Sequence, residues 1–234
     1  MNRISLKNNF ISVANRNSKS SFGGSQEWFV EPAWGNISRQ GCGIIAAVDT
    51  MLYILGTQDV SYEKYANTVD RFRAERKLSR LFMKEFPIRI YDNTKVAIGI
   101  LPFQMSGFLN KKMKAKGYKL RFRWNGIHGH RDMYRKMQSM ISRNIPVVWA
   151  LYSRNGAVRL YVKSNDSTGF KDVGITTNNH YVTATGIIEN VPSHSKLIEI
   201  SSWGKCYYID YDEYLEYVGS SLISQYCSNI LYTK

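Results

Sequence analysis

The longest apolar segment of the chain predicts a buried helix over residues 42–55. This segment reads CGIIAAVDTMLYIL, with Asp49 and Thr50 almost its only polar side chains. Apolar side chains would lie on nearly every face of such a helix, which is typical of a helix buried on most sides. Gly56 follows as a suitable residue for the position after a helix C-terminus. The preceding segment, 34–41, contains Gly, Asn and Ser and predicts a loop.

Further segments with helical spacing follow this one. Ser61 can cap the helix that begins after it, because a serine hydroxyl accepts a hydrogen bond from a free backbone N–H. Pro102 suits a first helical turn, and Gly117 suits the end of that helix. The helices are predicted in the segments 61–86, about 101–116, 130–144 and 212–218.

Strands are predicted mainly in the second half of the chain. The segment 146–152, PVVWALY, is continuously apolar and starts at a proline, where no ladder N–H is needed. The segment 118–124 alternates large and charged residues, which predicts one wet face. Further strands are predicted at 158–163, 180–188, 196–202, 205–211 and 225–233. This order predicts an α+β fold, with a helical layer packed against an antiparallel sheet.

The 234 residues are expected to form a single domain. Residues 1–27 are rich in Asn, Ser, Gly and Lys and predict a loosely ordered N-terminal arm. Residues 28–234 then form the domain, with a helical part over about 28–145 and a sheet part over about 146–234. No run of roughly 18 apolar residues occurs, and the N-terminus lacks an apolar signal segment, so we expect no membrane span and a cytoplasmic location.

The chain is strongly basic, with 32 Lys and Arg against 18 Asp and Glu, a net charge of +14. Such a chain is expected to bind polyanions nonspecifically at low salt. The cations concentrate in segments 71–80 and 111–123, and the second contains seven of them. A solvated helix face is the favoured interpretation of the first segment, and a polyanion site is the alternative. No helix-turn-helix, zinc-finger, RNA-recognition or P-loop signature is present.

The three cysteines are Cys42, Cys206 and Cys227. An odd and low count predicts no disulfide framework and suits a reducing compartment. No Cys-x-x-Cys occurs, and His128 and His130 lack partners at ligand spacing, so no metal site is predicted.

Cys42 would stand at the N-terminus of the buried helix. Free backbone N–H groups and the helix dipole favour an anion there, so we expect a lowered thiol pKa and a nucleophilic thiolate. The alternative is that Cys42 is only a small buried hydrophobe. A cysteine nucleophile needs a base, and His180 is the best candidate because it opens the apolar strand after the loop GITTNN.

Three elements in this order resemble the papain-like cysteine peptidases. They are the loop-to-helix Cys42, the strand-opening His180 138 residues later, and Ser-Trp-Gly at 202–204, 22 residues further on. The Cys-to-His separation lies in the family's ~130–150 range. The segments GCGIIAA, PVVWAL and HYVTATGI look closest to the bacterial branch that includes the double-glycine leader peptidases. The resemblance implies a papain-like fold, in which helices precede the sheet and a cleft lies between them.

The resemblance also assigns roles to single residues. Cys42 matches the nucleophile and His180 the general base. Asn36 matches the amide six residues before the cysteine that binds the oxyanion, with Gln40 as the alternative. Ser201 stands where the family has an Asn or Asp that orients the imidazole, and a hydroxyl there would hold the imidazole less firmly. Trp203 resembles the family's tryptophan that shields this hydrogen bond, although it would equally suit a core aromatic.

The sequence therefore predicts a cysteine peptidase or amide hydrolase that forms an acyl-enzyme on Cys42, needs no cofactor and acts on a peptide or protein. Acyl transfer and glutamine deamidation use the same residues. Two alternatives remain. Because of the departure at Ser201, the chain could be a catalytically silent papain-like binding module. Because of its two basic segments, it could instead bind nucleic acid or another polyanion.

Overall fold

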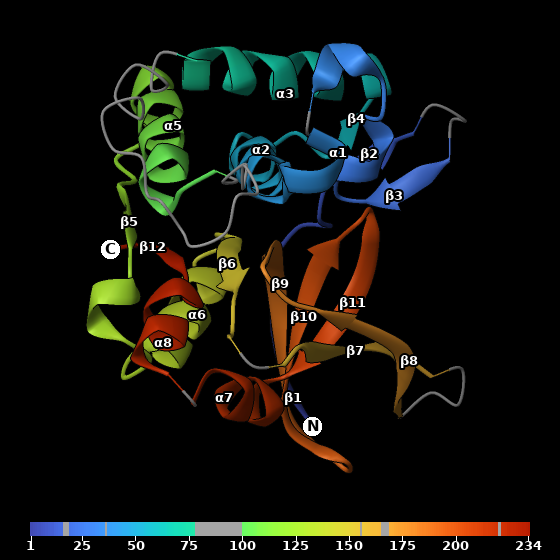
Figure 1. Ribbon diagram of the computed structural model, residues 1–234, viewed down its shortest axis with the longest axis vertical. Coiled ribbons are helices and arrows are strands. Elements are labelled where there is room, and N and C mark those ends of the chain that lie inside the picture. The colour runs from blue at the N-terminus through green and yellow to red at the C-terminus, as the bar shows by residue number, and fades with distance from the viewer. Residues whose placement is uncertain (16–18, 36, 78–99, 155, 165–168, 220) are drawn as a thin grey trace, which may run out of the picture.

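The helix that begins at Cys42 packs against the central strands of an antiparallel sheet in the computed structural model (Figure 1). The structure describes residues 1–15, 19–35, 37–77, 100–154, 156–164, 169–219 and 221–234. Helix α2 (Cys42–Ile54) is buried at every residue from Gly43 to Tyr53, as its apolar pattern predicts. Gly56 closes it with a φ of 75° and donates its N–H to the Tyr53 carbonyl.

The other predicted helices are confirmed with shifted ends. Ser61 accepts a hydrogen bond from the Lys64 N–H at 3.3 Å and so caps the helix that follows it. That helix is described only to Lys77, and the predicted continuation to residue 86 lies outside the described residues. The helices are α3 (Tyr62–Lys77), α5 (Pro102–Ala115), α6 (Met133–Ser142) and α7 (Tyr211–Gly219), with the short α1 (Ile37–Gln40) and α8 (Leu222–Cys227). Among the described residues, no helix is both long and apolar enough to span a membrane.

The main sheet has seven strands in the described part of the chain. Its order is β1-β9-β10-β11-β7-β8, and β6 pairs with β9 beside β1. All pairings are antiparallel, including the predicted hairpin of β9 and β10. The strands are β1 (Asn2–Ser5), β6 (Val147–Leu151), β7 (Val158–Lys163), β8 (Phe170–Thr177), β9 (His180–Val191), β10 (His194–Ser202) and β11 (Lys205–Asp210). These strands and the helices above confirm the α+β class.

Two predicted strands are shorter in the structure. Only β5 (Phe122–Trp124) forms within 118–124, and it pairs with β12 (Leu231–Thr233) in a separate two-stranded sheet. The start of the predicted strand 225–233 belongs instead to α8, because the Ser221 hydroxyl accepts from the N–H groups of residues 223 and 224 and caps a helix there. Strand β8 was not predicted, since its exposed, polar sequence does not alternate.

The prediction of a loosely ordered arm over residues 1–27 is wrong. Strand β1 pairs with β9, and β2 (Ser12–Ala14) lies between β3 (Ser20–Phe22) and β4 (Asp59–Val60) in a three-stranded sheet. Ile11 and Val13 are fully buried. The sequence pattern does not predict these strands because most of their residues are polar. Backbone pairing, with few apolar side chains, holds them in place. The sheet part therefore includes the chain's first strand.

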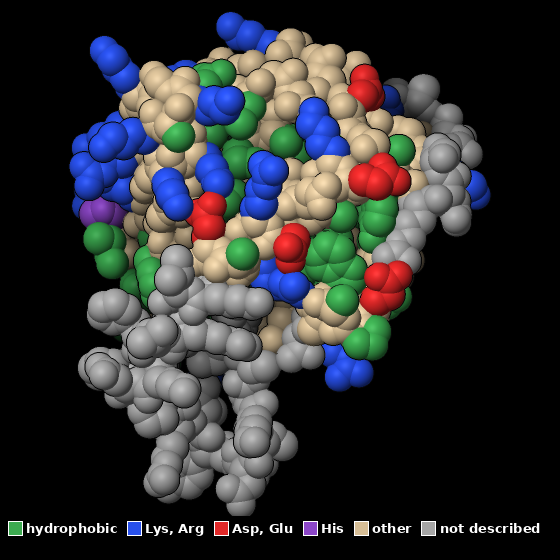
Figure 2. Space-filling model, turned by 90° about the horizontal axis from the view of Figure 1, so that it is seen from above, with side chains coloured by type: hydrophobic (Ala, Val, Ile, Leu, Met, Phe, Trp, Pro, Cys, Tyr) green, Lys and Arg blue, Asp and Glu red, His purple; other side chains and the backbone are tan. Residues whose placement is uncertain are grey.

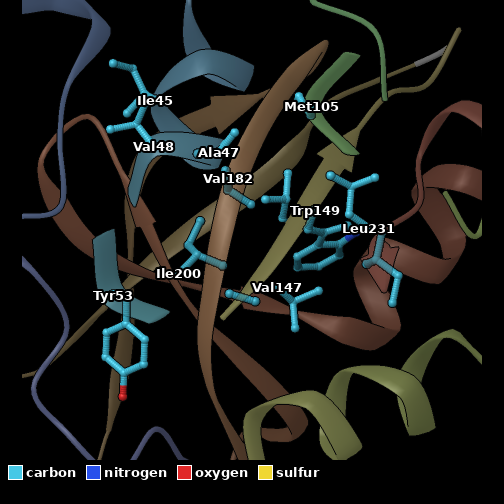
Figure 3. Packing of buried hydrophobic residues seen from close by; sticks show 14 of the residues in the cluster. Ile45, Ala47, Val48, Tyr53, Met105, Val147, Trp149, Val182, Ile200 and Leu231 are labelled. Carbon is cyan, nitrogen blue, oxygen red and sulfur yellow. The ribbon is translucent and has the colours of Figure 1, made fainter. Parts of the chain in front are cut away.

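The core lies between α2 and the sheet and continues beneath α5. Figure 3 shows Ile45 and Val48 of α2 near Val182 of β9 and Ile200 of β10, with Trp149 of β6 on the other side. The helices α3 and α5 join this core through the stacked rings of Phe72 and Phe108, 3.9 Å apart.

Candidate active site

Cys42 is the first residue of α2 and lies between two glycines that the packing requires. A Cβ at Gly41 would come within 2.5 Å of the Ile37 carbonyl oxygen. A Cβ at Gly43 would come within 2.2 Å of the Ile100 side chain and 3.1 Å of the Tyr181 ring. Real Cβ atoms do not approach so closely, so the sequence Gly-Cys-Gly lets this helix start fit against its neighbours.

His180 is the first residue of β9, and its imidazole is held from two sides. Its Nε2 lies 2.8 Å from the Ser202 Oγ. The ring of Trp203 stacks on it with centroids 4.5 Å apart and planes 15° apart. Trp203 lies in the two-residue turn between β10 and β11, with a φ of 50° followed by 72° at Gly204. Such left-handed pairs form tight hairpin turns, and this one places the indole over the imidazole.

Cys42 and His180 line one small, partly open pocket. The backbone N–H of Tyr181, the residue after His180, lies close enough to the Cys42 thiol to act on its pKa. The start of α2 therefore lies beside the start of β9. The residues that line the pocket are Gly24, Gln26, Cys42, Ile45, Ala46, Asp49, His180, Tyr181, Thr183, Ser201, Ser202 and Trp203.

The expected lowering of the Cys42 pKa is contradicted. Burial raises the pKa of the thiol, although the N–H groups of Tyr181, Gly43 and Cys42 itself act in the opposite direction. Burial also lowers the pKa of His180 to about 4. At neutral pH the resting pair is thus a neutral thiol and a neutral imidazole.

The placement of Ser201 beside the imidazole is also wrong. The Ser201 hydroxyl donates to the Phe22 carbonyl at 2.7 Å, and Ser202 makes the contact with His180. The cause is a bulge opposite Glu199 and Ile200, where β9 contains one extra residue, Thr185, so that Ser201 pairs with Thr183. An unshifted register would pair Ser201 with residue 184, on the His180 face of the strand, and a shift of one residue exchanges the two faces.

The amide donors predicted for the oxyanion differ in their placement. Asn36 lies outside the described residues. Gln40 is half-buried in α1 and is not among the described residues that line the pocket. Gln26, which the sequence analysis missed, does line it. Its Nε2 donates to the Ser38 carbonyl at 2.9 Å, and its Oε1 is buried without a partner among the described atoms.

Asp49 is a second residue of the pocket that the sequence analysis did not assign. Its carboxylate accepts hydrogen bonds from the Tyr65 hydroxyl at 2.6 Å and from the Gly24 N–H at 3.0 Å. Burial raises the pKa of Asp49 to about 7, and these two donors only partly oppose the shift. The only sequence signal was an acidic residue inside an otherwise apolar helix.

A short N-terminal segment, Phe22–Gly24, connects the two sides of the pocket. The Phe22 N–H donates to the Gly204 carbonyl at 2.8 Å, and the Gly204 N–H donates to the Gly24 carbonyl at 3.0 Å. Through the Gly24 bond to Asp49, the same segment reaches α2. It therefore links the helix that carries Cys42 to the turn that carries Trp203.

Comparison with protein-family models, with curated proteins and with solved structures finds no match to this chain. Among the described residues, no group of three or more His, Cys, Asp or Glu side chains could hold a metal ion. The described residues of the basic segments 71–80 and 111–123 do not line the pocket.

Proposed function

We propose that this chain is a papain-like cysteine hydrolase of peptide or amide bonds, with Cys42 as nucleophile and His180 as base. The observation that carries the proposal is that Cys42 and His180 line one pocket while Ser202 occupies one imidazole nitrogen. Nδ1 is then the nitrogen that takes the thiol proton. Because the resting pair is neutral, the proton moves to the imidazole as the sulfur attacks, rather than before the substrate arrives.

The reaction then follows the chemistry of an activated thiol. The sulfur bonds to the substrate carbonyl carbon, and the carbonyl oxygen becomes an oxyanion. The second amide hydrogen of Gln26 and the backbone N–H of Cys42 bind it. The C–N bond breaks, the imidazolium gives its proton to the leaving amine, and a thioester remains. Water attacks the thioester, gives a proton to His180 and releases the acid, and the thiol is restored.

A peptide mixture tests this proposal. Wild-type protein is incubated with peptides of varied sequence, and new termini are detected by mass spectrometry. We expect cleavage that disappears in Cys42→Ala and His180→Ala but persists in Cys206→Ala, the matched control, whose cysteine lies in β11. Gln26→Ala should lower kcat by about a hundredfold, the usual effect of removing one oxyanion donor. Cleavage that persists in Cys42→Ala would contradict the proposal.

The second candidate function is a catalytically silent binding module, and the pKa shifts of Cys42 and His180 favour it. Burial raises the thiol pKa and lowers the imidazole pKa, so both shifts oppose formation of an ion pair. The imidazole partner is a hydroxyl rather than a carboxylate, so nothing at that position stabilises a positive charge. A peptide that protects Cys42 from alkylation and is recovered uncleaved would support this candidate.

A further inference from the structure

A row of cations continues from the end of α5 onto β5. The segment 111–123, KKMKAKGYKLRFR, contains seven Lys and Arg and no acidic residue. Glu75 of α3 pairs with the first two lysines. The other five cations are exposed and form no ion pair within the described part of the chain. These five, which we call the basic tract, are Lys114, Lys116, Lys119, Arg121 and Arg123.

The backbone arranges the tract along one face. Lys119, Arg121 and Arg123 alternate with Leu120, Phe122 and Trp124, of which Phe122 is buried in the core and the other two pack against it. Exposure alternates along this segment, so the three cations lie on the solvent side while Leu120 and Phe122 lie on the packed side. Figure 2 shows Lys and Arg side chains gathered on the α5 side of the face that it presents. A line of like charges in a segment that contains no acidic residue attracts an extended polyanion.

An exposed aromatic ring directly precedes these three cations in the chain. Tyr118 is 41% exposed, and its hydroxyl donates to the Ile54 carbonyl at 3.1 Å. The bond ties the ring to the end of α2, which makes it a fixed platform. Proteins that bind single-stranded nucleic acid without sequence preference combine a basic track with aromatic rings on which bases stack.

A lipid surface fits the same region less well. A helix that lies on a membrane needs an unoccupied apolar face. Four large apolar side chains of α5, Met105, Phe108, Leu109 and Met113, are buried in the core, and the exposed Phe103 stands alone at the end of the helix away from the basic tract. We propose that the basic tract binds single-stranded nucleic acid, with phosphates along the cations and a base on Tyr118. No tract residue lines the Cys42 pocket, so this inference does not rest on the proposed hydrolase activity.

The test measures binding of a labelled oligothymidylate longer than the roughly 16 nucleotides that such sites span. Fluorescence anisotropy is recorded at several salt concentrations. The tract variant carries Lys116→Glu, Lys119→Glu and Arg121→Glu. The matched control carries Lys19→Glu, Lys163→Glu and Lys171→Glu, three exposed lysines elsewhere. Each set of changes lowers the net charge from +14 by 3 × 2 to +8.

We expect the tract variant to bind the oligonucleotide at least about tenfold more weakly than the wild-type protein. The slope of its log affinity against log salt concentration should also be smaller by about 2, because each of the three lost phosphate contacts contributes about 0.7. The control should keep the wild-type slope. Tyr118→Ala should weaken binding about fivefold, whereas Tyr118→Phe, which keeps the stacking face and loses only the hydroxyl bond to Ile54, should weaken it less. Thermal melts check that each variant folds, and Gln replaces Glu in any that does not.

Three outcomes would overturn the proposal. Equal loss in the tract and control variants would show that net charge alone acts. Binding to vesicles of phosphatidylcholine and phosphatidylserine, but not to the oligonucleotide, would assign the tract to a lipid surface. Absence of oligonucleotide binding by the wild-type protein at low salt would exclude a nucleic-acid site.

Discussion

The Ser202 hydroxyl lies 2.8 Å from Nε2 of His180, at the point where β10 ends beside the start of β9. Its neighbour Ser201 instead donates to the Phe22 carbonyl. The two serines are adjacent in sequence and similar in burial, yet they contact different parts of the molecule. This contrast supplies a matched pair of variants.

Ser202→Ala should lower the hydrolysis rate about tenfold, roughly 1.4 kcal/mol in the activation barrier, because the imidazole loses its orienting partner. Ser201→Ala should leave kcat near the wild-type value and lower the free energy of unfolding by about 1 kcal/mol, because it removes a buried hydrogen bond. Steady-state kinetics and urea denaturation of both variants separate the two roles. A larger kcat loss in Ser201→Ala would reverse the assignment.

The pH dependence of stability should contain two opposing contributions. The pKa of His180 is lowered to about 4, so the folded state binds fewer protons than the unfolded state below the ordinary histidine pKa, and stability falls as pH falls from about 6.5 to about 4. The pKa of Asp49 is raised to about 7, so the folded state holds an extra proton, and stability falls as pH rises from about 4 to about 7.

Removing either group should therefore leave the contribution of the other, so variants of Asp49 and His180 should show opposite slopes of unfolding free energy against pH between pH 4 and 6.5. Asp49→Asn leaves the His180 contribution, so its unfolding free energy should rise with pH. His180→Gln leaves the Asp49 contribution, so its unfolding free energy should fall with pH. The wild-type profile should be flatter than either. Urea midpoints across this range measure all three, and parallel profiles would show that neither group is perturbed as described.

The glycines beside the nucleophile give a test of packing. Gly43→Ala should lower the free energy of unfolding by about 1–3 kcal/mol, because the new Cβ meets Ile100 at 2.2 Å. Gly107→Ala is the matched control. It lies within α5, and its Cβ would meet nothing within 4 Å. That change should stabilise the protein by about 0.5–1 kcal/mol, and equal effects of both changes would argue against the tight start of α2.

The alkylation rate of Cys42 shows whether burial or the helix dipole has the larger effect on the pKa of its thiol. Since burial raises its pKa, Cys42 should react with iodoacetamide at pH 7 more slowly in the folded protein than after unfolding in urea. The rate should still be rising above pH 9. Peptide mapping assigns the modified cysteine. Rapid reaction of Cys42 at pH 6 would instead show that the helix N-terminus dominates, as the sequence alone predicted.

The sequence predicted the elements that depend on local pattern. The apolar run of α2 and the continuously apolar β6 are strong signals, and both elements formed as expected. The N-terminal strands escaped prediction because their polar residues are held mainly by backbone pairing with β9 and β4. Strand β8 escaped for a similar reason, because its exposed side chains carry no alternation.

The sequence predicted only those residues of the candidate site that stand at the start of a helix or strand. Cys42 at a helix start and His180 at a strand start were found in this way, and the structure places both on one pocket. The partner of His180 was misplaced because a single bulge in β9, opposite Glu199 and Ile200, shifts its register against β10 by one residue, and no residue pattern marks it. Gln26 reaches the pocket through the tertiary path of the N-terminal segment, which no spacing from Cys42 reveals.

The most direct test of the central claim is to trap an acyl group on Cys42. The protein is mixed with a p-nitrophenyl ester of an N-acetyl amino acid, quenched in acid, and its intact mass and peptides are measured. The account predicts one acyl group, located on Cys42, with nitrophenolate released, and no acylation in His180→Ala. Equal acylation of Cys206 and Cys227, or unchanged acylation of Cys42 in His180→Ala, would contradict it.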